Sequence, residues 1–189
     1  MRQFMTRSFA VFVLVHLFLN ISVLQNGFCE EELRPRYEYG LSLLGGGGHE
    51  DDPDIRYYAA YPRWGWTFLE RHAFELEGNI GHYRVNSIDM TSLGLQGLFT
   101  YDFYRFKHGK AFIAAGGGLI YLDLDERPGV GDSSVVALGQ AGAGLKFGVG
   151  SKKALRLEYR FQHVSDPFDS NDHGWNYHCF VLGISWLKY

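Results

Sequence analysis

The feature that most constrains this chain is a run of strict alternation from Leu155 to Ser165. Odd positions are apolar as far as Phe161, and even positions carry Arg, Glu or Gln as far as Gln162. Side chains on a strand point to opposite faces in turn, so the run predicts a strand with one apolar and one charged face. His163 and Ser165 continue the apolar face. A soluble sheet would bury that face, whereas a membrane barrel would turn it to lipid and keep the charged face inside.

Seven further segments of similar character are separated by polar or glycine-containing breaks. Regular strands with turn signals between them are typical of a sandwich or a barrel. Many of these segments match the length of about nine to eleven residues that a tilted strand needs to cross a bilayer. Together with the run above they make eight, and the other seven are Tyr37 to Leu44, Ile55 to Phe68, Ala73 to Tyr83, Ile88 to Tyr104, Ala111 to Leu124, Val135 to Val149 and Gly174 to Trp186.

Charged residues opposite the apolar faces favour a membrane barrel over a secreted sandwich. They fit ion pairs inside a small barrel that is too narrow for a pore, and they are Glu75, Glu77, Arg156, Glu158 and Arg160. We therefore expect an all-β fold, an eight-stranded antiparallel transmembrane β-barrel. The aromatic last residue, Tyr189, suits such a barrel, although its parity puts it on the inner side.

Glycine runs lead to two further expectations. Gly45 to Gly48 predicts a turn or loop, because no helical pattern or Lys-Ser/Thr pair follows it as in a phosphate-binding loop. Two other groups are expected to give room inside a tight barrel, and they are Gly116 to Gly118 and the set Gly139, Gly142 and Gly144.

The N-terminal segment reads as a targeting signal. A positively charged start and an apolar run from Phe9 to Leu24 predict a signal peptide over residues 1–29, cleaved before Glu30, and a barrel domain over residues 30–189. A retained membrane anchor is the alternative, although the run is short for a spanning helix. Cys29 could instead carry a lipid. After cleavage Cys179 alone remains, so no internal disulfide is possible. A net charge of -3 without a basic stripe gives no indication of nucleic-acid binding.

Polar groups at the end of the alternating run indicate a functional site. With both termini in the periplasm, this strand ends at the outer surface. A symmetric hairpin around residues 166–173 pairs His163 with Asn176 and Ser165 with Gly174. Polar groups that face hydrocarbon cost roughly one to several kcal/mol each, so function explains the cluster better than stability does. Serine beside histidine is the nucleophile and base pair of acyl transfer. The alternative is an ordinary wet cluster at headgroup level.

The end of the chain resembles a known family. The segment Arg160 to Ser165, followed by Asn171, Gly174, Asn176 and His178, is similar to the closing motif of the lipid A 3-O-deacylase family, the PagL-like acyloxyacyl hydrolases. The resemblance implies an eight-stranded barrel of the bacterial outer membrane that hydrolyses an ester-linked acyl chain of lipid A in the outer leaflet. It implies Ser165 as nucleophile and His163 as base on the lipid-facing wall, with Asn176 at the position of the acid.

Two positions depart from the family pattern. The residue after the serine is usually an asparagine that helps to hold the oxyanion, and here it is Asp166. A carboxylate there would repel the developing negative charge unless it were protonated or turned away. Asn176 can orient His163 through its side-chain oxygen but brings no charge. Asp166 and the loop residue Asp172 are candidates for oxyanion or charge support.

Other interpretations stay open at this point. The runner-up is a non-catalytic structural or binding barrel that has lost the family activity. A metal site from His163, His173 and His178 is a third interpretation, but no tight ligand spacing supports it. Hydrolysis by a serine and histidine pair needs no cofactor, so none is expected. The sequence leaves open whether two copies form a homodimer.

Overall fold

The computed structural model describes residues 36–48, 54–86, 88–123, 134–167 and 174–189. The predicted signal peptide therefore lies outside the described residues. Arg34–Tyr189 forms one compact unit. No helix among the described residues is long and apolar enough to span a membrane. The described residues form eight strands: β1 (Tyr37–Gly48), β2 (Ile55–Leu69), β3 (His72–Val85), β4 (Ile88–Phe106), β5 (Gly109–Asp123), β6 (Val135–Val149), β7 (Lys153–Ser165) and β8 (Trp175–Lys188).

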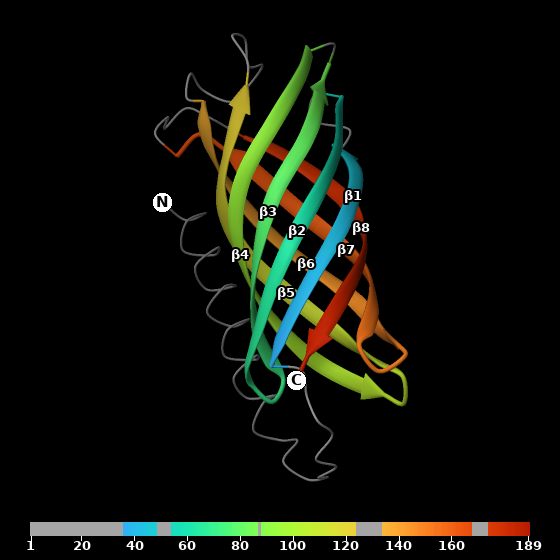
Figure 1. The fold of residues 1–189 in the computed structure, drawn as a ribbon. Coiled ribbons are helices and arrows are strands. Elements are labelled where there is room, and N and C mark those ends of the chain that lie inside the picture. The colour runs from blue at the N-terminus through green and yellow to red at the C-terminus, as the bar shows by residue number, and fades with distance from the viewer. Residues whose placement is uncertain (1–35, 49–53, 87, 124–133, 168–173) are drawn as a thin grey trace, which may run out of the picture. The chain divides into compact units, whose positions relative to one another are not determined.

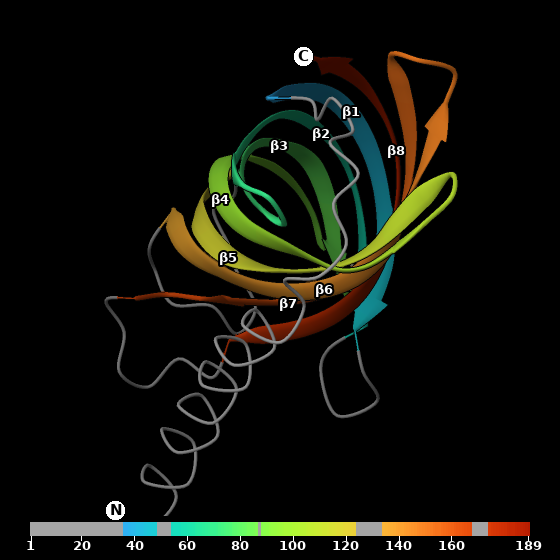
Figure 2. The same cartoon turned by 90° about the horizontal axis from the view of Figure 1, so that it is seen from below.

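The strands close into a single barrel (Figure 1). Each strand pairs antiparallel with its neighbours in sequence, and β1 also pairs with β8, so no edge is left open. Seen from below, the strands curve around a common interior (Figure 2). Closure matters physically because an open edge presents unpaired N–H and C=O groups, which hydrocarbon cannot satisfy. The predicted number and antiparallel order of the strands are confirmed.

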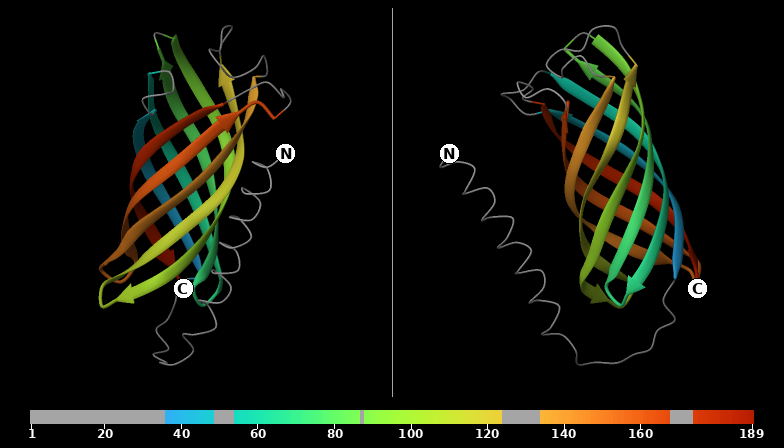
Figure 3. Two further views of the ribbon diagram at one scale, coloured as in Figure 1. Left: turned by 180° about the vertical axis from the view of Figure 1, so that it is seen from behind. Right: turned by 90° about the vertical axis from the view of Figure 1, so that its left-hand side faces the viewer.

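The two ends of the barrel differ in their connections. At the end where the C-terminus lies, the strands are joined through residues 70–71, 107–108 and 150–152 (Figure 3). At the other end, three of the four connections are longer and span residues 49–54, 124–134 and 166–174. Outer-membrane barrels have short periplasmic turns and longer extracellular loops. The end of β7 that carries Ser165 therefore belongs to the outer end of the barrel.

Alternating side chains separate an apolar outer wall from a filled interior. Outward positions carry exposed aromatic and aliphatic residues, including Trp64, Trp66, Leu93, Leu95 and Phe180. Trp64 and Trp66, two residues apart in β2, share the outer face. In β5, where the sequence does not separate the faces, Phe112, Ile120 and Leu122 point inward, whereas Leu119 and Tyr121 point outward.

The lower interior, nearer the short turns, is filled by ion pairs. Arg156 donates to Glu75 at 2.6 Å and to Glu158 at 2.7 Å. Arg160 donates to Glu77 at 2.7 Å and to Glu158 at 2.9 Å. All five of these side chains are almost inaccessible to solvent, and each carboxylate has a cationic partner. The predicted ion pairs inside the barrel are therefore confirmed.

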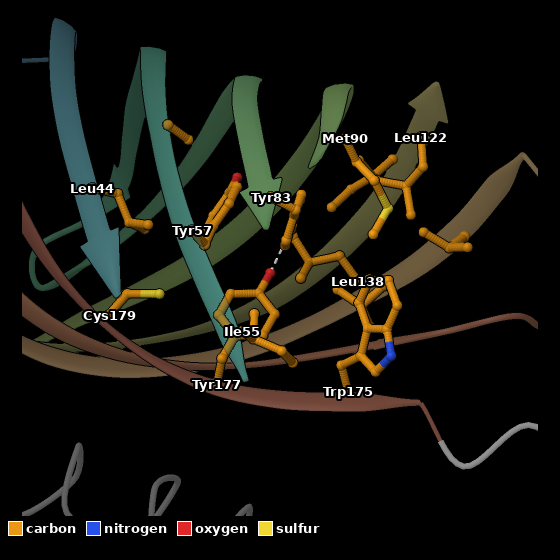
Figure 4. Packing of buried hydrophobic residues seen from close by; sticks show 14 of the residues in the cluster. Leu44, Ile55, Tyr57, Tyr83, Met90, Leu122, Leu138, Trp175, Tyr177 and Cys179 are labelled. Carbon is orange, nitrogen blue, oxygen red and sulfur yellow. Dashed lines mark hydrogen bonds between the residues drawn. The ribbon is translucent and has the colours of Figure 1, made fainter. Parts of the chain in front are cut away.

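The upper interior, near the long connections, is closed by packed aromatic and aliphatic side chains (Figure 4). Tyr83 and Tyr177 share a hydrogen bond of 2.6 Å between their hydroxyls, and the ring of Tyr57 stacks on Tyr83 with 4.0 Å between centroids. Trp175 lies beside them and is 1% exposed. This packing accounts for the inward direction of every second residue at the start of β8.

Two expectations about glycines from the sequence were wrong, the second of them in part. Gly45–Gly48 is not a turn but the end of β1, where a Cβ on Gly46 would collide with the His178 carbonyl oxygen of β8. The glycines at the end of β1 thus allow β1 and β8 to pair and close the barrel. The sequence pattern alone does not reveal this role. Of the glycines expected inside, Gly116, Gly118, Gly142 and Gly144 have the inward parity, but Gly117 and Gly139 point outward.

The parity of Tyr189 does not place its side chain inside the barrel. Strand β8 ends at Lys188, so the residue lies beyond the alternating ladder. The side chain of Tyr189 is 54% exposed, and its hydroxyl donates to the Ser151 carbonyl at 3.1 Å.

Candidate functional site

His163 and Ser165 lie on the outer wall of the barrel at the end of β7. Along this strand every second residue is buried from Ala154 to Val164, and the intervening positions face outward. His163 and Ser165 fall at these intervening positions, and both are half-buried. Because β7 keeps its alternation to its last residue, the predicted outward direction of both side chains is confirmed.

Asn176 holds the imidazole of His163 from the neighbouring strand. The two residues are direct partners in the β7–β8 ladder, as the symmetric hairpin predicts. His163 Nδ1 and Asn176 Oδ1 are 2.9 Å apart. Since an amide oxygen only accepts, Nδ1 carries the proton and donates it, which leaves Nε2 as the basic nitrogen. This is the tautomer that a general base for a serine requires.

Gly174 forms the floor against which the imidazole lies. Its φ is +65°, a left-handed conformation that favours glycine. A Cβ there would lie 2.5 Å from the Val164 carbonyl oxygen and 2.8 Å from His163 Cε1. Glycine is thus required both by the backbone turn into β8 and by the space that the ring occupies.

Ser165 shares the face of His163 two residues further along β7. The β7–β8 ladder ends at the pair Val164 and Trp175, one pair before the predicted pairing of Ser165 with Gly174. Within the described part of the chain, no hydrogen bond joins the Ser165 hydroxyl to His163. Catalytic hydrogen bonds of this kind often tighten only when substrate binds.

The acidic candidates lie beyond the strand. Asp166 follows Ser165 directly and is buried, at 6% exposed, whereas Ser165 is half-buried. It lies one residue beyond the end of β7, so the alternation of the strand does not fix its direction. Asp172 lies outside the described residues, as do Asn171 and His173.

A second polar pair lies on the same wall, nearer the middle of the barrel. Tyr159 Oη and His178 Nδ1 are 2.5 Å apart, and their rings stack with 5.8 Å between centroids. Phe161 packs its ring against His178 from the strand position opposite. The outward parity of His178 is visible in the sequence, but its partnership with Tyr159 follows only from the register of β7 against β8. His178 therefore belongs with Tyr159 and not with His163.

The arrangement has the parts of a hydrolytic site. It presents a basic imidazole nitrogen, a hydroxyl on the same face and an amide that fixes the ring. These groups face away from the barrel interior, so a substrate has to approach along the outer wall.

Family membership follows from the sequence as a whole. A family model described as lipid A 3-O-deacylase (PagL) matches residues 54–185, which includes β7, β8 as far as Ser185 and the three residues of the candidate site. The chain belongs to this family. No curated protein matches the chain.

Solved structures agree with a lipid A 3-O-deacylase in fold. The outer membrane enzyme PagL is 20% identical, with a TM-score of 0.56 over 76% of this chain and 97% of that one. Neisserial surface protein A is 14% identical, with a TM-score of 0.56 over 81% and 96% of the two chains. The attachment invasion locus protein Ail of Yersinia pestis is 11% identical, with a TM-score of 0.52 over 82% and 99%.

Family and fold together fix the surroundings of the barrel. A lipid A 3-O-deacylase with a closed barrel and an apolar outer wall is a protein of the bacterial outer membrane, which confirms the predicted location. The outward side chains of His163 and Ser165 therefore lie on the membrane-facing wall, near the outer end of the barrel.

Proposed function

We propose that the protein hydrolyses the ester-linked 3-O acyl chain of lipid A, with Ser165 as nucleophile, His163 as base and Asn176 as the group that orients the base. The observation that carries the proposal is the hydrogen bond from His163 Nδ1 to Asn176 Oδ1 at 2.9 Å, on a lipid-facing wall, beside a serine. Ester hydrolysis uses these three groups in these roles.

The proposed reaction has two steps. In the first, Ser165 Oγ attacks the ester carbonyl carbon while His163 Nε2 takes the hydroxyl proton. The carbon–oxygen bond to the sugar then breaks, and the imidazolium returns its proton to the leaving sugar oxygen. In the second, His163 takes a proton from a water that attacks the acyl-serine, which releases the fatty acid and restores the serine hydroxyl. The proposal needs one chain only, since all three residues come from one hairpin.

Charge compensation is the weak part of such a site. Asn176 fixes the tautomer of His163 but adds no negative charge to balance the imidazolium that forms during attack. Asp166 is proposed to give that support, because it is an acidic residue buried one position beyond Ser165 and negative charge nearby favours a cation. Because it is buried whereas Ser165 is half-buried, its carboxylate is proposed to lie away from the oxyanion.

The first prediction tests the nucleophile directly. The gene for the full chain is expressed in a Gram-negative host, and lipid A is extracted and measured by mass spectrometry. We expect loss of the mass of one acyl chain with the wild type and no loss with Ser165→Ala, since the alanine has no hydroxyl to form the acyl-enzyme. Thr91→Ala is the matched control, because Thr91 is an exposed hydroxyl residue near the outer end of β4.

Each outcome separates the interpretations. Equal release by wild type and Ser165→Ala would contradict the assignment of the nucleophile. Intact lipid A with the wild type would favour the non-catalytic barrel instead. Release by Thr91→Ala at the wild-type level is needed for the effect of Ser165→Ala to be specific.

A further inference from the structure

Gly139 lies directly beside the imidazole of the proposed site. It is the partner of His163 in the β6–β7 ladder, on the opposite side from Asn176. Its position faces outward and is exposed. The strands that carry these residues run side by side on one part of the wall (Figure 3, left).

The fold itself gives no reason for a glycine here. A Cβ on Gly139 would have no heavy atom within 4 Å, and the backbone is not in the left-handed region. By contrast, a Cβ on the inward Gly118 would collide with the Leu95 carbonyl oxygen. Glycine inside a strand loses conformational entropy and contributes no packing. Barrel packing therefore does not explain the open space above Gly139, whereas a molecule bound against the outer wall does.

The two sides of His163 differ in chemistry. On the β8 side stand Asn176 and, two pairs deeper, His178 with its hydrogen bond to Tyr159. On the β6 side the outward positions flanking Gly139 are Ala137 and Ala141, and neither carries a polar group. An apolar chain that leaves an ester at Ser165 is accommodated without burying polar groups only on the β6 side.

From β7 to β6 and β5, the residues paired in register with His163 lie successively nearer the middle of the membrane. His163 lies two residues before the end of β7. Gly139 lies four residues after Val135, the first residue of β6. Gly117, its partner in the next strand, lies six residues before Asp123, the last residue of β5. Each step away from His163 is therefore further from the outer end of the barrel.

The outward glycines Gly139, Gly117 and Gly97 of β6, β5 and β4 form a path along the wall, and bulky side chains bound it on either side. Toward the outer end of the barrel, the next outward-facing residue of β5 after Gly117 is Leu119, which is 56% exposed. The path continues from Gly117 to its partner Gly97, where a Cβ would come within 3.0 Å of the ring of Phe74. Three strand spacings separate His163 from Gly97, which gives a length of roughly 14 Å. Phe99, the next outward residue of β4 toward the short turns, bounds Gly97 on the other side.

We propose that the acyl chain to be cleaved lies across β6 and β5, over Gly139 and Gly117, with its end toward Phe74. Gly139 is then a specificity-determining residue, because it keeps the wall flat at the point where the chain leaves the ester. This inference rests on the proposed function and adds to it the route of the chain and the side of His163 on which it lies.

Two measurements test the route with the full chain in lipid bilayers. The first compares initial rates of acyl release from lipid A. Gly139→Leu is expected to slow release at least about tenfold, because added methylenes fill the path, and Gly139→Ala to fall between it and the wild type. Ala143→Leu is the control, an exposed outward position on the same strand that lies roughly 13 Å deeper. It is expected to leave the rate unchanged. Heat-dependent mobility in gels verifies that all variants fold.

The second measurement locates the chain without catalysis. A lipid A analogue with a diazirine at the end of its 3-O acyl chain is photolysed with Ser165→Ala, and the labelled peptides are identified by mass spectrometry. Labels are expected in β4 around Gly97 and in β3 around Phe74. Labels concentrated in β8 or spread evenly around the barrel would overturn the route, and so would a wild-type rate for Gly139→Leu. If the wild type released no chain, the proposed function would fail, while the position of the labels would still decide the route.

Discussion

In the proposed site, Asn176 orients the base as the third residue of a triad does, but it brings no negative charge. Its oxygen accepts from His163 Nδ1 at 2.9 Å, so the ring is held in the tautomer that a base requires. In serine hydrolases the third group also stabilises the imidazolium, which a neutral amide does much less. The two roles can be separated because asparagine and aspartate have the same shape.

A third prediction, after those for Ser165 and Gly139, separates the orienting role of Asn176 from the effect of charge. Asn176→Ala removes the hydrogen bond and is expected to lower kcat on lipid A by on the order of 10²-fold to 10⁴-fold, as loss of the correct tautomer does elsewhere. Asn176→Asp keeps the acceptor and adds charge, so its kcat is expected to equal or exceed that of the wild type. A wild-type kcat for Asn176→Ala would mean that the ring is held by other contacts.

At the level of single residues, the sequence predicts what lies within one hairpin. The outward direction of His163 and Ser165 follows from alternation, and the pairing of His163 with Asn176 follows from a symmetric turn. The neighbours from β6 were not predicted, because the register between β6 and β7 depends on the exact place of the short turn at residues 150–152. Gly139 was expected inside the barrel because it is small, although it has the same parity as the outward Ala137 and Ala141 and lies beside the site.

Among the elements, the hairpin of β7 and β8 gives the site its geometry. Gly174 leads into β8 with a φ of +65°, and its Cα lies against the His163 ring. Apart from those of β1, strand bounds were predicted to within two residues, and the segment Val135 to Val149 has the same bounds as β6 although glycines interrupt it. Segment 37–44 extends to Gly48 because glycines at the seam allow β1 to approach β8.

The fourth prediction concerns this turn. Gly174→Ala is expected to lower the free energy of unfolding by about 1–2 kcal/mol through its left-handed backbone. It is also expected to lower kcat, because the methyl group displaces the imidazole. Gly150→Ala is the matched control, since Gly150 has a φ of +67° and no heavy atom within 4 Å of an added Cβ. Urea unfolding in lipid vesicles should give a larger loss for Gly174→Ala, whose methyl group also meets the Val164 carbonyl oxygen, and assays on lipid A should detect a defect only for Gly174→Ala. An equal defect in both would attribute it to stability.

Across the whole molecule, charged side chains hold the lower interior together. Arg160 lies between Glu77 and Glu158, and Arg156 lies between Glu75 and Glu158. The sequence predicts these residues as inward-facing from parity alone, and the pairing across the barrel, from β7 to β3, follows once the number of strands is known. The aromatic closure of the upper interior was not predicted, because its members come from several strands with irregular patterns.

The fifth prediction tests the ion pairs. Arg160→Met leaves two buried carboxylates without one of their partners, which is expected to lower the free energy of unfolding by about 3–5 kcal/mol. Arg84→Met is the control, because Arg84 pairs with Asp89 at 3.3 Å at an exposed site and such pairs contribute about 0–1 kcal/mol. Tryptophan fluorescence during urea unfolding in vesicles measures both. Losses of equal size would mean that the interior is open to water.

The outward direction of His163 also decides how the barrel would encounter its substrate. A group on the lipid-facing wall is reached by molecules that diffuse sideways within the leaflet, so no lipid has to be lifted out of the membrane. Turnover would then depend on the surface density of lipid A and on the fluidity of the leaflet, not on any concentration in bulk water. Divalent cations that pack neighbouring lipopolysaccharides tightly would slow such an enzyme without binding to it.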